Sequence, residues 1–216
     1  MDTKAFRNVT NKIGIKLKWI TSDNGPEGNA YPIAKNFGHF SMGHWRGIKN
    51  DLLEVGHREP FIAKWPSVIS ANTVCDQLVS LGDLMATCAE ITHAQLPDGT
   101  GENNISMLLL LAGNTETPTR ENLILHSRWS GNFALRKGDW VYINAPSGGD
   151  CFNTSDPGNK KEPEWFRKLR DYNFHDEPGQ LFDLSSDESE KNNLYAERPE
   201  IVREMRACLV STIEQQ

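Results

Sequence analysis

The stretch that decides the fold is Ile20-Thr-Ser-Asp-Asn-Gly25, and a second informative segment, residues 46–66, follows it. Residues 13–22 alternate apolar and polar side chains and then become apolar, which predicts a β-strand ending just before Asp23 and Asn24. Open α/β sheets place their sites at the carboxyl ends of strands. The sequence therefore predicts two adjacent hard oxygen donors at the edge of a sheet.

Taken alone, Asp23-Asn24-Gly25 favours a simple turn over a site, because Asn-Gly is a strong hairpin signal. The residues that follow, 26–30 (Pro-Glu-Gly-Asn-Ala), are not a strand, so a hairpin has no second arm. The second segment supplies a cation, Lys49, before the chain re-enters the core at Phe61 and Ile62. The missing second arm counts against a hairpin, and both the turn and a functional loop remain open on these residues alone.

Composition excludes several classes of function. The chain has 216 residues, enough for one or two domains, and its 23 basic against 29 acidic residues give a net charge of −6. No basic field is available for nucleic acid or an anionic membrane surface. The longest apolar run, Met107–Ala112, is far shorter than the roughly 20 residues that span a bilayer. The N-terminus shows no apolar signal-peptide region, and no partner protein can be inferred.

The remaining segments predict a sequence of short elements. Residues 26–47 predict a long loop, residues 60–66 and 77–81 short strands, and Asp83 the start of a helix. After a polar linker, residues 123–126, 133–136, 140–143 and 180–184 predict an antiparallel sheet, interrupted by a surface excursion over residues 145–180. A final helix begins near Pro199 and carries one apolar stripe that includes Ile201, Met205, Cys208 or Leu209, and Ile213.

Three further segments point to a family: Asp83-Leu-Met-Ala-Thr-Cys-Ala-Glu-Ile, Phe133-Ala-Leu-Arg-Lys-Gly-Asp-Trp, and residues 181–194 with their pattern L-F-D-L-x-x-D-x-x-E-x-x-N-L. Together with residues 20–25 and 46–66 they resemble, in order, the C-terminal half of a type I sulfatase (arylsulfatase), a formylglycine-dependent enzyme with an alkaline-phosphatase-like fold. The resemblance implies an α/β protein. Residues 1–112 are expected to be part of the catalytic sheet domain, and residues 113–216 a small antiparallel sheet with a C-terminal helix.

The resemblance also implies roles for residues. Asp23 and Asn24 match two ligands of a Ca²⁺ or Mg²⁺ ion, and such ions prefer carboxylate and amide oxygens. Lys49 matches the lysine that contacts the sulfate group. A sulfate ester gathers negative charge on its oxygens as the S–O bond breaks, so a fixed ammonium and a divalent cation stabilise the transition state.

The other matched residues surround this site. His39 and His44 lie where the family places a substrate-facing histidine, and a surface position is the alternative for each. Arg46, His57 and Arg58 are expected to support the site rather than to touch substrate. The segment Glu54-Val-Gly-His-Arg-Glu-Pro60 departs from the family pattern E-G-G-H-R-V-P at two positions.

The family's nucleophile has no counterpart in these residues. None of the four cysteines, at positions 75, 88, 151 and 208, has Pro or Ala at +2 with Arg at +4, as the formylglycine segment requires. Two interpretations remain open. The chain is either part of a sulfatase that hydrolyses sulfate esters of small molecules or carbohydrates, inactive alone and with an incomplete metal site, or a non-catalytic remnant that binds a cation or an anionic carbohydrate.

The resemblance implies a secreted, periplasmic or lysosomal protein, but the missing signal region leaves localisation open. The sequons at Asn8, Asn104 and Asn153 carry no weight without secretion.

Overall fold

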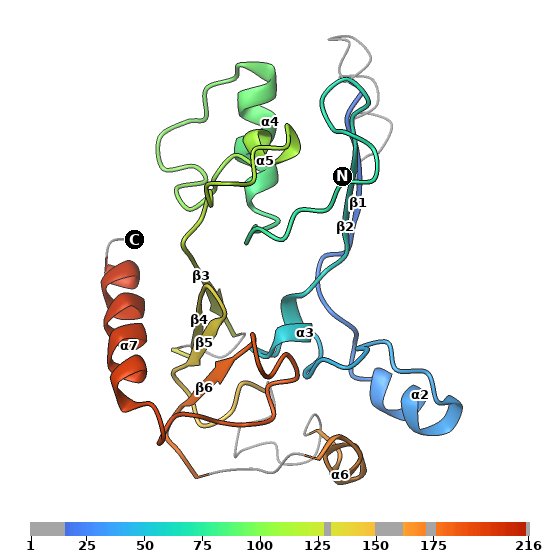
Figure 1. Cartoon of the computed structure of the whole chain (residues 1–216), viewed down its shortest axis with the longest axis vertical. Coiled ribbons are helices and arrows are strands. Elements are labelled where there is room, and N and C mark those ends of the chain that lie inside the picture. The colour runs from blue at the N-terminus through green and yellow to red at the C-terminus, as the bar shows by residue number, and fades with distance from the viewer. Residues whose placement is uncertain (1–15, 128–130, 150–161, 172–175, 215–216) are drawn as a thin grey trace. The chain divides into compact units, whose positions relative to one another are not determined.

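The computed structural model describes residues 16–127, 131–149, 162–171 and 176–214 (Figure 1). The chain forms two compact units, one made of Met1–Asp23 and Pro60–Glu121 and the other of Asn24–Glu59 and Asn122–Gln216. The expected division after residue 112 concerns the domains of a whole sulfatase and stays a prediction. The sequons at Asn8 and Asn153 lie outside the described residues.

The first unit contains a two-stranded antiparallel sheet. Strand β1 (Lys18–Thr21) pairs with β2 (Phe61–Lys64), with Lys18 opposite Lys64 and Thr21 opposite Phe61. Within the described residues, β1 is shorter than the predicted strand over 13–22, and β2 confirms the prediction for residues 60–66. Helices α4 (Asp83–Thr92) and α5 (Leu108–Leu111) complete this unit.

The predicted strand at residues 77–81 is wrong, because this segment leads into α4 instead of joining a sheet. The backbone N–H of Ser80 donates to Oδ2 of Asp83 at 2.8 Å. Asp83 is buried, and its Oδ1 accepts from the N–H of Ile105 at 2.9 Å and from Arg120 at 2.5 Å. The aspartate at the start of α4 therefore ties the helix to two later segments.

The second unit is built on a four-stranded antiparallel sheet. Its order is β3-β4-β5-β6, with bounds Asn122–His126, Phe133–Lys137, Trp140–Ile143 and Gln180–Asp183. Helix α7 (Pro199–Glu214) covers one face through Val202, Met205 and Leu209, which pack on Leu135, Tyr142 and Leu181. The predicted small sheet beneath a C-terminal helix is confirmed.

The opposite face of this sheet holds the segment that carries Lys49. Ala134, Val141 and Phe182 alternate along the strands with the residues that face α7, and they pack against Leu52 and Leu53. The N–H of Leu52 also donates to the carbonyl oxygen of Gly148 at 2.6 Å. The period-2 pattern thus gives the sheet two buried faces, one for a helix and one for the candidate site loop.

The prediction of a continuous loop over residues 26–47 is wrong, because helix α2 (Ala30–Phe37) lies within it. Ala30, Tyr31 and Ala34 form its buried face, and Gly38 ends it in the left-handed conformation with its N–H donating to Ala34.

The excursion over residues 145–180 also contains a helix, α6 (Glu164–Arg170). Its buried Phe166 meets the ring of Tyr31 edge-on at 5.0 Å. Much of the rest of this excursion lies outside the described residues. No helix in the described part of the chain is both long and apolar enough to cross a lipid bilayer.

Candidate functional site

The two segments singled out in the sequence meet in the second unit. The N–H of Lys49 donates to the carbonyl oxygen of Pro26 at 2.8 Å, and the N–H of Gly25 donates to that of Gly56 at 3.3 Å. A Cβ atom on Gly25 would lie 1.7 Å from the carbonyl oxygen of Val55, so only glycine permits this approach. The residues after Asn24 are therefore held directly against the segment that carries Lys49.

Lys49 lies in a tight turn of residues 48–51. The N–H of Asp51 donates to the carbonyl of Ile48 at 3.0 Å, and Oδ2 of Asp51 accepts from the N–H of Ile48 at 2.8 Å. Asp51 and Ile48 are buried, whereas Lys49 keeps 36% of its side chain exposed. Its Nζ lies 2.9 Å from Oε1 of Glu27. The turn thus presents a reachable ammonium group on a fixed backbone.

Asp23 and Asn24 follow β1 directly, with Asp23 exposed and Asn24 half-buried. Asp23 is the last residue of the first unit and Asn24 opens the second. The remaining predicted site residues (His39, Arg46, Lys49, His57 and Arg58) belong to the second unit with Asn24.

Arg46 is buried and anchors the start of the Lys49 segment. Its Nε lies 3.2 Å from both carboxylate oxygens of Glu162, and its Nη2 is 3.1 Å from Oε2. Its Nη1 donates to the backbone carbonyl of Glu190 at 3.0 Å. All these contacts are internal, so Arg46 holds the backbone at this point.

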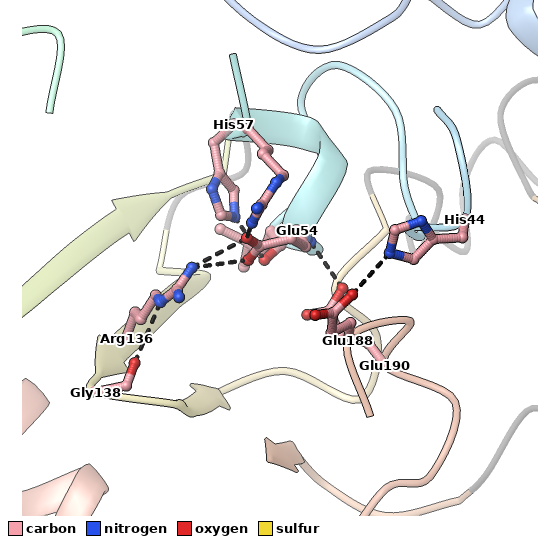
Figure 2. A network of polar contacts seen from close by, with 9 residues as sticks. His44, Glu54, His57, Arg136, Gly138, Glu188 and Glu190 are labelled. Atoms are coloured by element: carbon pink, nitrogen blue, oxygen red, sulfur yellow. Dashed lines mark hydrogen bonds and ion pairs between the residues drawn. The ribbon is translucent and has the colours of Figure 1, made fainter. Parts of the chain in front are cut away.

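Glu54 anchors the end of the same segment, at the start of the short helix α3 (Glu54–His57). Figure 2 shows its carboxylate facing Arg136 and its backbone facing Glu190. Oε1 and Oε2 of Glu54 accept from Nη1 of Arg136 at 3.0 and 3.3 Å, and Arg58 makes a further ion pair. The N–H of Glu54 donates to Oε2 of Glu190 at 2.7 Å.

Glu190 is fully buried, and desolvation raises the pKa of its carboxyl to about 8. The hydrogen bond from Glu54 and the charge of Arg46 oppose this rise, and the carboxylates of Glu54 and Asp187 add to it. Its Oε1 has no hydrogen-bond partner among the described residues. A buried acid in this setting is held in its neutral form at neutral pH.

The predicted supporting residue His57 is mostly buried, with Nε2 3.3 Å from the carbonyl oxygen of Leu52. Burial lowers its pKa below 6.5, against the opposing charge of Glu54. Arg58 is more exposed, and its guanidinium lies over the ring of Trp45 at 4.4 Å.

The two histidines of the preceding loop are both exposed. His44 lies 2.8 Å from Glu188 (Figure 2) and stacks at 4.1 Å on Trp45. For His39 the structure gives an exposed position, and its role facing substrate stays a prediction.

Glu27, Glu54 and Glu190 make contacts that hold Lys49 or its segment, and the sequence alone does not indicate these roles. Glu54 and Glu190 stand in the quoted motifs, but nothing local signals that residues 136 positions apart share a hydrogen bond. Glu27 follows Asn24 by three positions, but no local pattern indicates that its carboxylate pairs with Lys49.

The donor chemistry of Asp23 and Asn24 fits a hard divalent cation, but the number of donors does not complete a site. Within the described residues, no cluster of three or more His, Cys, Asp or Glu side chains is arranged to hold a metal ion. The two residues fit a partial ligand set.

Comparison with known proteins places these features in a family. An N-acetylgalactosamine-6-O-sulfatase from Bacteroides thetaiotaomicron is 34% identical over 198 residues, which cover 89% of this chain and 35% of the relative. Bovine arylsulfatase A is 32% identical over the same share of this chain and 36% of its own length. No protein-family model matches the sequence.

Solved structures share the fold of this chain. A Bacteroides thetaiotaomicron structure described in the context of glycosaminoglycan metabolism has a TM-score of 0.69 and 28% identity, over 99% of this chain and 42% of that one. A Pseudoalteromonas sulfatase has the same fold, with a TM-score of 0.64 at 21% identity, over 98% of this chain and 40% of that one. The chain thus spans about a third of the curated relatives' length. It belongs to the sulfatase family, whose alkaline-phosphatase-like α/β fold it shares in part.

Proposed function

We propose that this chain supplies the sulfate-binding part of a sulfatase that hydrolyses sulfate esters of carbohydrates. Lys49 contacts the sulfate group, and Asp23 and Asn24 are two ligands of a Ca²⁺ or Mg²⁺ ion. The observation that carries the proposal is the hydrogen bond from the N–H of Lys49 to the carbonyl oxygen of Pro26. Because Pro26 follows Asn24 by two residues, this bond holds the turn that carries Lys49 against the backbone just after Asn24.

The chemistry follows from charge. As the S–O bond of a sulfate ester breaks, negative charge develops on the sulfate and leaving oxygens, and a preorganised ammonium stabilises it without reorganisation. A bound divalent cation would add fixed positive charge to the same group. Glu27, paired with Lys49, holds the ammonium until an anionic substrate competes for it. The 34% identity to an N-acetylgalactosamine-6-O-sulfatase supports a sulfated amino sugar as substrate class.

A second candidate is a non-catalytic protein that binds a cation or an anionic carbohydrate. None of the four cysteines has the neighbours of a formylglycine segment, so these residues include no nucleophile of that kind.

One experiment separates the two candidates. The chain is joined to the nucleophile-bearing N-terminal part of the Bacteroides thetaiotaomicron relative, and release of sulfate is measured from an aryl sulfate and from N-acetylgalactosamine 6-sulfate. The sulfatase proposal expects turnover only when both parts are present. A folded fusion that carries formylglycine but shows no turnover would favour the non-catalytic candidate.

A further inference from the structure

One residue binds both ends of the segment that carries Lys49. The backbone carbonyl of Glu190 accepts from Arg46 at 3.0 Å, and its Oε2 accepts from the N–H of Glu54 at 2.7 Å. Glu190 lies more than 130 positions from either partner in the sequence and has 0% of its surface exposed. We propose that Glu190 is a positioning residue that, as a neutral carboxylic acid, holds residues 46–54 in the arrangement that presents Lys49.

The turn around Glu190 is itself fixed. The N–H of Glu190 donates to the carbonyl of Asp187 at 3.1 Å, and Oδ2 of Asp187 accepts from the N–H groups of Lys191 and Asn192, each at 2.8 Å. Glu190 has a φ of 51°, which is uncommon for a residue with a side chain. Its surroundings therefore hold it in a conformation that aims the carboxyl inward at α3 (Figure 2).

The charges around Glu190 explain why the acid is neutral. Arg46, Glu54 and Asp187 face it, but Arg46 already binds the carboxylate of Glu162 through three contacts. Arg58 and Arg136 bind the carboxylate of Glu54 rather than that of Glu190.

An ionised Glu190 would be a buried anion whose Oε1 has no hydrogen-bond donor among the described residues. A buried charge without such a donor is costly. The protonated form keeps Oε2 as the acceptor for Glu54 and places its proton on Oε1.

The stability of the contact between residues 46–54 and Glu190 depends on pH. We call residues 46–54 closed when they are bound to Glu190 and open when they have moved away from it. In the open form Glu190 reaches water and ionises near its ordinary pKa of 4.5, whereas in the closed form its pKa is about 8. The open form therefore binds fewer protons between these values, and the closed form loses stability as pH rises from about 4.5 to about 8. A loss of sulfate binding over this range follows only if the function proposed for Lys49 holds.

Amide hydrogen exchange on the purified chain tests the positioning without any need for activity. Protection factors for residues 48–56, corrected for intrinsic exchange, are measured from about pH 5 to about pH 9. Wild-type protection should fall with rising pH, by at most about tenfold per pH unit, and level off above about pH 8. Glu190→Gln, which keeps a neutral acceptor of the same shape, should retain protection and lose the fall in protection with rising pH. Glu190→Ala should lower protection throughout.

Glu188→Gln is the matched control, because Glu188 lies two positions away and pairs with His44 at the surface. It should behave as wild type. The proposal is overturned if Glu190→Gln keeps the wild-type fall in protection with rising pH, or if Glu190→Ala folds with unchanged protection. Glu190→Gln decides the matter where Glu190→Ala does not fold, and neither readout depends on sulfatase turnover.

Discussion

The backbone N–H of Lys49 donates a hydrogen bond to the carbonyl oxygen of Pro26, with 2.8 Å between the two atoms. This bond joins two segments whose candidate site residues, Asn24 and Lys49, stand 25 positions apart in the sequence. A second bond, from Gly25 to Gly56, holds the same two backbones together. Two main-chain hydrogen bonds thus hold the two segments together, alongside the ion pair of Lys49 with Glu27.

Gly25→Ala should separate these backbones, because the new methyl group would lie 1.7 Å from the carbonyl oxygen of Val55. The expected loss in the free energy of unfolding is about 1–3 kcal/mol, measured by urea denaturation. Gly28→Ala is the matched control, since its nearest neighbour is Cδ1 of Ile48 at 3.9 Å. Equal stability of the two variants would show that the close approach is absent in solution.

His57 should make the protein sensitive to acid. Burial lowers the pKa of His57 in the folded chain below 6.5, so the unfolded chain takes up the proton first as pH falls. The free energy of unfolding should therefore decrease as pH drops below about 6.5. His57→Gln should remove this contribution, and the exposed His39→Gln should keep it, in denaturation curves recorded at several pH values. A variant at His57 with the wild-type acid slope would contradict the assignment. The contribution of Glu190 has the opposite sign, so the Glu190→Gln background isolates that of His57.

The purified 216-residue chain should show no turnover of a generic aryl sulfate. Its cysteines lack the sequence that becomes formylglycine, and Asp23 and Asn24 would supply only part of the proposed metal site. Calcium binding should be weak as well, because calcium sites normally use about six to eight oxygen ligands. Hydrolysis and a calcium titration are measured in parallel. Metal-dependent turnover by this chain would show that the missing-nucleophile argument is wrong.

The sheet of the second unit could be predicted because its strands carry a period-2 pattern with two apolar faces, seen in Ala134 and Leu135. The C-terminal helix was predictable from Pro199 and its apolar stripe. Helix α2 was not, because a segment rich in Gly, Asn and Pro has weak helical propensity and gains its helix from the burial of Tyr31 and Ala34.

The candidate site, like the fold, can be predicted from the sequence only in part. Asp23, Asn24 and Lys49 are candidates from the sequence because their residue types and order match a family pattern. The residues that fix Lys49 in space were not, because the bonds of Glu190 to Arg46 and Glu54 depend on tertiary contacts. From the sequence alone, Glu54 and Glu190 would be placed at the surface, because Glu is seldom fully buried without a partner.

The most direct test of the account compares Lys49→Ala with wild type in the reconstituted enzyme, through kcat/KM for an aryl sulfate. Loss of a preorganised positive group at the sulfate should lower kcat/KM by roughly 10²–10³-fold. Lys35→Ala, on the exposed side of α2, should leave kcat/KM unchanged. A Lys49→Ala enzyme that is folded and as active as Lys35→Ala would contradict the assignment of Lys49 to the sulfate group.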